Sequence, residues 1–224
     1  MMRPLAVLLL LAPAACAPIV THGPRVEPGL HFTGTLGVAR NACDTACSLD
    51  ILPQIGMGAR YGRAADDGRP GYSVAGTLAL GLVSSELDAY VQAPTSPSWA
   101  AGGGLLLSPA HVMPYLQAGR VEEDGSGLYT TQGFAVLASR ERVFDIDEDL
   151  EVAPRYWAPT LAYRAAYRGG AIHVYLSGAV GWMDVRAVEG QSRREPVRLL
   201  MAGLSFEQRI RGTLLPILPP LRSP

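Results

Sequence analysis

Apolar residues recur at every second position along much of this chain, and this alternation constrains its fold more than any other feature. In residues 72–83, one parity carries Tyr72, Val74, Leu78, Leu80 and Leu82. In residues 171–183, one parity carries Ile172, Val174, Leu176, Val180 and Trp182. Small or polar residues occupy the other parity in both segments. A period of two predicts β-strands with one apolar face.

Ten segments of this kind follow one another at short intervals, separated by connections rich in Gly, Pro, Asp and Ser. They are residues 30–40, 51–61, 72–83, 87–93, 99–107, 111–121, 128–139, 157–167, 171–183 and 196–207. A tilted strand that crosses a bilayer needs about 9–11 residues, and Tyr and Trp recur near the segment ends, as interfacial aromatic residues do. The pattern predicts an all-β chain: a single antiparallel up-and-down β-barrel of eight to ten strands over residues 30–210. The longest connections, 41–50, 140–156 and 184–195, are expected at one end.

The regions outside the barrel have different compositions. Residues 1–15 combine Arg3, an apolar stretch at 5–11 and small residues before Cys16, which predicts a signal peptide. The apolar stretch is too short to cross a bilayer as a helix, which takes about 20 residues. Residues 16–29 contain three prolines and show no period, so we expect a Pro-rich tether, and 211–224 form a Pro-rich C-terminal tail.

Residues 14–16 (Ala-Ala-Cys) resemble the lipobox of bacterial lipoproteins. The resemblance implies that Cys16 is acylated and becomes the mature N-terminus. Ordinary cleavage near Ala14 or Ala15 is the alternative.

The other two cysteines, Cys43 and Cys47, are an even pair in an exported chain. Their spacing leaves three intervening residues, whereas thiol redox sites usually have two. A metal site would need more ligands than the nearby Asp44 and Asp50. A structural disulfide between the two cysteines is the favoured interpretation.

The parity opposite the apolar face holds small residues with a few charges of both signs, which suits a narrow barrel filled by side chains. The polar residues predicted to lie inside are Arg60, Asp88, Tyr90, Arg164, His173, Tyr175, Ser177 and Glu207. His173 and Ser177 share this face, but four positions along a strand separate them by about 13 Å. We therefore expect no catalytic dyad from them.

Composition excludes several functions. The 19 cationic residues are all arginine and 20 acidic residues nearly balance them, so neither a nucleic-acid partner nor lysine chemistry is expected. The four histidines lack metal-ligand spacing, so we predict no cofactor and no metal site. Arg193, Arg194 and Arg198 form a small basic cluster near one strand end, open to lipid headgroup contact or to ordinary solvation.

Residues 114–119 (PYLQAG) and 200–206 (LMAGLSF) resemble strands of the small outer-membrane β-barrel proteins of Gram-negative bacteria. The resemblance implies an outer-membrane location, contact with membrane lipid, and lipopolysaccharide or a surface molecule as partner. It also implies a structural or surface-interaction role and no catalysis. The alternative is a soluble, lipid-anchored periplasmic barrel that binds a small apolar ligand, like a lipocalin, with its apolar parity pointing inward.

Overall fold

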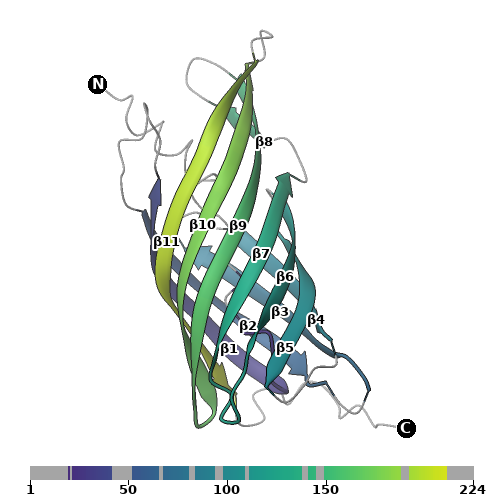
Figure 1. Cartoon of the computed structure of the whole chain (residues 1–224). Coiled ribbons are helices and arrows are strands. Elements are labelled where there is room, and N and C mark those ends of the chain that lie inside the picture. The colour runs from purple at the N-terminus through teal and green to yellow at the C-terminus, as the bar shows by residue number, and fades with distance from the viewer. Residues whose placement is uncertain are drawn as a thin grey trace, which may run out of the picture.

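The computed structural model describes residues 20, 22–41, 52–65, 68–80, 84–93, 98–108, 111–137, 141–144, 149–187 and 192–210. Eleven β-strands account for most of these residues (Figure 1). The strands are β1 (Gly29–Asn41), β2 (Leu52–Arg63), β3 (Gly71–Leu80), β4 (Ser84–Gln92), β5 (Trp99–Leu107), β6 (His111–Arg120), β7 (Gly127–Leu137), β8 (Glu141–Phe144), β9 (Asp149–Tyr167), β10 (Gly170–Ala187) and β11 (Ser192–Arg209). Within these ranges, no helix is long and apolar enough to cross a membrane.

The strands close into one antiparallel barrel. Each long strand pairs with the next along the chain, and β1 pairs with β11 from His31↔Arg209 to Asn41↔Leu199, so the sheet has no open seam. The short β8 pairs with β9 beyond the last β7–β9 pair, Val136↔Arg155, and so continues the position of β7. The barrel wall therefore has ten positions, which confirms the predicted all-β, up-and-down barrel.

Side chains on every long strand alternate between an apolar outer face and a packed interior. On β10, Val174 and Leu176 are 53% and 51% exposed, whereas His173 and Ser177 are 1% and 2% exposed. Exposed apolar residues on the ten wall strands include Leu36, Met57, Val74, Val91, Leu105, Leu116, Phe134, Leu161, Leu176 and Leu204. We call this outward-facing surface the outer apolar belt. Its position follows the parity that the sequence predicts.

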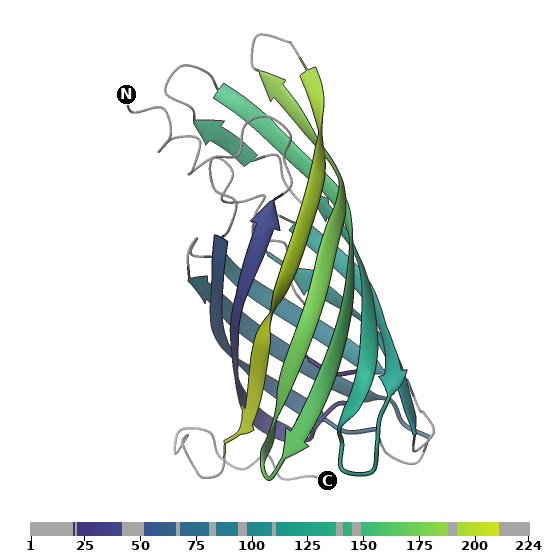
Figure 2. The ribbon, with the colours of Figure 1, turned by 60° about the vertical axis from the view of Figure 1, so that its left-hand side comes forward.

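The two ends of the barrel differ. At the lower end in Figure 2, β1 begins and β11 ends, and Arg168 and Gly169 make a tight turn between β9 and β10. At the upper end, β9, β10 and β11 run past the other long strands, with 19, 18 and 18 residues against 9–13 (Figure 1). Residues 149–154, 183–187 and 192–195 form this β9–β11 extension.

The extension corrects the expectation that 140–156 and 184–195 are long loops. Much of both ranges is strand, because three neighbouring strands supply hydrogen-bond partners for one another's backbones. A cross-strand pair supports it: Asp184 lies opposite Arg194, whose Nε donates to its Oδ1 at 2.8 Å.

Candidate functional site

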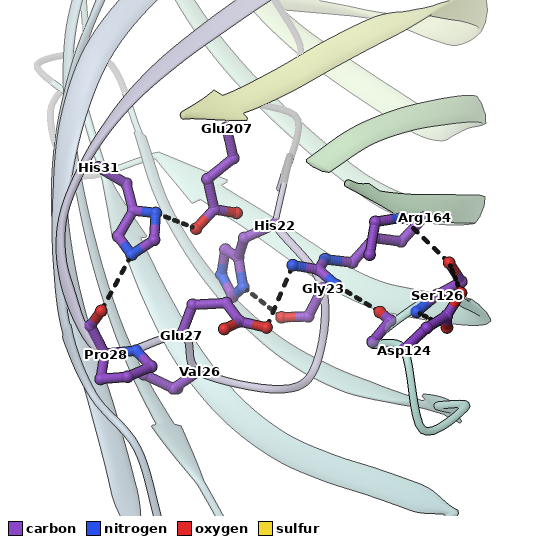
Figure 3. Close-up of polar contacts among 12 residues, drawn as sticks. His22, Gly23, Val26, Glu27, Pro28, His31, Asp124, Ser126, Arg164 and Glu207 are labelled. Carbon is purple, nitrogen blue, oxygen red and sulfur yellow. Dashed lines mark hydrogen bonds and ion pairs between the residues drawn. The ribbon is translucent and has the colours of Figure 1, made fainter. Parts of the chain in front are cut away.

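The described part of the expected tether lies inside the barrel. Val20, His22, Pro24 and Val26 are all buried, and Figure 3 shows the chain passing through the interior with the barrel wall around it. We call Val20 and residues 22–28 the luminal segment. The prediction of a tether at 16–29 is corrected for these residues, because a solvated tether would not be buried against the wall.

Wall side chains hydrogen-bond the backbone of the luminal segment. Tyr90 Oη donates to the Pro24 carbonyl at 2.9 Å, and Gln117 Nε2 donates to the His22 carbonyl at 2.6 Å. The Val26 amide donates to Gln92 Oε1 at 2.7 Å. These contacts from β4 and β6 supply the partners that a buried backbone needs. The wall is thus built to hold a chain segment.

A charged cluster in the lumen joins this segment to a third strand, β2, as well as to β4 and β6. Asp88 Oδ2 lies 3.2 Å from Arg60 Nη2 and 3.1 Å from His22 Nε2, and Tyr115 Oη donates to Asp88 Oδ1 at 2.6 Å. His22 Nδ1 lies 2.8 Å from the Gly23 carbonyl, so both ring nitrogens lie within hydrogen-bonding distance of oxygen atoms. We call His22, Arg60, Asp88 and Tyr115 the Asp88 cluster.

A second set of polar contacts lies near the lower end (Figure 3). Arg164 Nη2 lies 3.1 Å from Glu27 Oε1 of the luminal segment, and Arg164 Nη1 donates to the Gly125 carbonyl. Glu207 Oε1 is 3.3 Å from His31 Nδ1, and His31 Nε2 is 3.3 Å from the Pro28 carbonyl. These contacts fix the segment where it turns into β1.

A cavity of about 210 Å³ lies beside these groups. Residues that line it include Glu27, His31, Asp124, Arg164, Glu207 and Arg209, so it is polar and carries both signs of charge. In the part of the chain described, no group of three or more His, Cys, Asp or Glu residues is arranged to hold a metal ion.

All eight polar residues predicted for the interior are placed there. Arg60, Asp88, Tyr90, Arg164, His173, Tyr175, Ser177 and Glu207 are each 9% exposed or less. The first three belong to or adjoin the Asp88 cluster, and Arg164 and Glu207 lie at the lower end.

The remaining three have separate surroundings. His173 Nδ1 is 2.9 Å from Tyr129 Oη, and its Nε2 is 3.8 Å from Glu207 Oε2. Ser177 Oγ instead pairs with Thr160 Oγ1 at 2.7 Å, so His173 and Ser177 have different partners. Tyr175 fills space that glycine leaves: a Cβ at Gly37 would overlap its hydroxyl oxygen.

Sequence reasoning missed the luminal segment and its receptors, especially His22, Tyr115 and Gln117. One signal was present: Val20, His22, Pro24 and Val26 occupy one parity, and all four are buried. Prolines obscured this alternation. Cys16, Cys43 and Cys47, like residues 1–15 and 211–224, lie outside the described residues, so acylation and the disulfide stay predictions.

No protein family and no curated protein matches the chain. Among solved structures, the NanC porin matches with 7% identity and a TM-score of 0.40, covering 81% of this chain and 100% of its own. The outer membrane protein OprG from Pseudomonas aeruginosa matches with 8% identity and a TM-score of 0.43, covering 84% and 100%. The β domain of the Bordetella autotransporter BrkA matches with 10% identity and a TM-score of 0.37, covering 81% and 100%.

Proposed function

We propose that this chain is an integral outer-membrane β-barrel with a structural or surface-interaction role, and that its own N-terminal segment occupies its lumen. The observation that carries the proposal is the outer apolar belt, which surrounds a polar interior. Such a surface is costly in water and stable in hydrocarbon, where a closed barrel satisfies all its backbone groups.

The belt has the height of a bilayer core. On β10 it runs from Ile172 to Trp182, which is about 33 Å along the strand and about 25 Å across a membrane at the usual tilt. Aromatic residues mark both edges: Tyr61, Tyr72, Trp99 and Tyr167 near the lower end, and Trp157 and Trp182 near the upper end. Aromatic residues are enriched at membrane interfaces.

The soluble, lipocalin-like alternative requires the reverse parity. It would place apolar side chains inside to receive an apolar ligand. Here the lumen holds the Asp88 cluster and the luminal segment, while residues such as Leu176 and Leu204 face outward. The observed parity therefore favours the membrane-integrated barrel.

The filled lumen supports a role other than open diffusion or catalysis. His22 and Val26 occupy space that a solute would need. The chain of contacts from Tyr129 through His173 to Glu207 resembles a proton relay, but these three side chains are 3%, 1% and 6% exposed. Of the three, only Glu207 lines the polar cavity near the lower end. The β9–β11 extension offers a surface for a partner beyond the belt.

The first test is the gel mobility of the detergent-extracted membrane fraction, compared before and after boiling. A closed, detergent-resistant barrel is expected to shift on boiling. Cys16→Ala, which removes the predicted acylation site, is expected to leave the protein in the membrane, because the proposed barrel is itself integral. The proposal fails if boiling causes no shift and Cys16→Ala releases the protein in soluble form.

A further inference from the structure

Four exposed arginines lie on the outer face of the barrel near its upper end: Arg40 on β1, Arg155 on β9, and Arg194 and Arg198 on β11. Three of them directly follow the outer apolar belt. Arg40 comes two positions after Val38, Arg155 two positions beyond Trp157, and Arg198 two positions beyond Leu200. Their guanidinium groups therefore start at the boundary between hydrocarbon and headgroups, if the belt spans the membrane as proposed.

Strand register makes these arginines neighbours. Arg40 lies opposite Leu200, and Arg198 lies opposite Val180, so Arg198 is diagonal to both Arg40 and Trp182. Diagonal neighbours are about 7–8 Å apart, within reach of long side chains. Arg155 lies directly opposite Trp182. The group spans β9, β10, β11 and β1, a width of about 14 Å at the usual strand spacing.

The cluster is one-sided. The outward-facing residues nearest the upper end on the other strands, among those whose side chains are described, are apolar: Pro53, Leu78, Leu87, Leu107, Val112 and Val136. Among the described side chains, positive charge at this level is therefore concentrated on β9, β11 and β1, which ordinary solvation does not require.

Most of the positive charge in the cluster is uncompensated. Asp184 pairs with Arg194, whose guanidinium also lies 5.5 Å from the centre of the Trp182 ring. Within the described residues, Arg40, Arg155 and Arg198 have no ion-pair or hydrogen-bond partner for their side chains. Trp182 itself is 43% exposed. Two free guanidinium forks, those of Arg155 and Arg198, thus flank an exposed indole at the edge of an apolar wall, and that of Arg40 lies on the next strand beyond Arg198.

We propose that this cluster binds the phosphate groups of lipopolysaccharide in the outer leaflet. Guanidinium matches phosphate with two parallel hydrogen bonds, and the belt below it receives acyl chains. A cluster about 14 Å wide suits a lipid that carries more than one phosphate better than a single-phosphate headgroup. The upper end corresponds to the extracellular side of the membrane. Outer-membrane barrels have short turns on the periplasmic side and longer extracellular connections, and here β1 begins and β11 ends at the lower end while the strands extend farthest at the upper end.

This inference rests on the proposed membrane integration and has its own test. The upper triple variant is Arg40→Gln, Arg155→Gln and Arg198→Gln, and the control triple at the lower end is Arg63→Gln, Arg120→Gln and Arg168→Gln, all at exposed positions. The full chain is purified in detergent free of lipopolysaccharide. Purified lipopolysaccharide, dephosphorylated lipopolysaccharide and phosphatidylglycerol are then titrated, with binding followed by native mass spectrometry.

We expect the upper triple variant to bind lipopolysaccharide roughly tenfold or more weakly, since it loses charge-assisted hydrogen bonds. The control triple should bind like the wild type, and dephosphorylated lipopolysaccharide should bind the wild type no better than it binds the upper triple variant. Unchanged binding in the upper triple, equal loss in both triples, or equal affinity for phosphatidylglycerol would overturn the inference.

Gel mobility separates this outcome from the proposed function. A wild-type barrel that fails to shift on boiling argues against membrane integration itself. A barrel that shifts but binds lipopolysaccharide regardless of the three arginines argues against the site alone. If the upper triple variant does not reach the folded mobility, the single variants Arg155→Gln and Arg198→Gln are titrated in its place, each with a smaller expected loss.

Discussion

Replacing Leu176 with arginine is expected to destabilise the folded barrel by about 2–4 kcal/mol, the cost of a cation near the middle of a bilayer on a lipid-facing strand. Leu176 is already 51% exposed and lies near the middle of the outer apolar belt. At an exposed position of a soluble protein, the same change costs less than about 0.5 kcal/mol. Equilibrium unfolding by denaturant of the protein inserted in phosphatidylcholine vesicles measures the difference.

The matched control is Trp99→Arg. Trp99 is also outward-facing and 58% exposed, but it lies at the lower edge of the belt. An arginine there costs about 0–1 kcal/mol, because the side chain reaches the interface. Depth dependence is the informative result: equal, small losses at both positions would mean that the belt faces water.

Asp88→Ala is expected to cost about 3–5 kcal/mol, because it leaves the buried Arg60 guanidinium without its counter-charge. It also removes the acceptor of Tyr115 and a contact of His22. The luminal segment should then loosen, so that trypsin cleaves after Arg25. Unfolding in vesicles and the mass of tryptic fragments are the two measurements.

Two controls accompany this variant. Adding Arg60→Met to Asp88→Ala removes both charges and should recover stability, with a coupling of about 0.5–3 kcal/mol between the two sites. Asp124→Ala changes an exposed aspartate whose hydrogen bonds, among the described residues, go only to Ser126 of the same turn. It should cost about 1 kcal/mol or less. Equal costs for Asp88→Ala and Asp124→Ala would contradict the importance of the Asp88 cluster.

The wall of the barrel could be predicted because it depends on a short-range pattern, the alternation of apolar and small or polar residues along each strand. Each strand has one outward-facing apolar side and one packed side, so alternate residues differ in character within any short window. Val174 and His173 differ in exposure for this reason alone. The same alternation correctly predicted that residues as far apart in sequence as Arg60 and Glu207 face the interior, and this prediction did not require knowing which residues they contact.

The luminal segment was not predictable in this way. It forms no strand, and its partners are distant in sequence: His22 contacts Tyr115, 93 positions away. Its buried backbone is satisfied by side chains such as Tyr90 and Gln117, and only the folded barrel brings these together. The β9–β11 extension was missed for another reason. Nearly half of its residues are charged, so its composition resembles that of a loop.

The central claim is that the outer apolar belt lies in lipid, and tryptophan fluorescence tests it most directly. The chain has three tryptophans, and Trp99, Trp157 and Trp182 all face outward, at 42–58% exposure. In vesicles of phosphatidylcholine with brominated acyl chains, we expect most of the emission to be quenched relative to unbrominated vesicles. Emission that is equal in the two kinds of vesicle would contradict a membrane-integrated barrel.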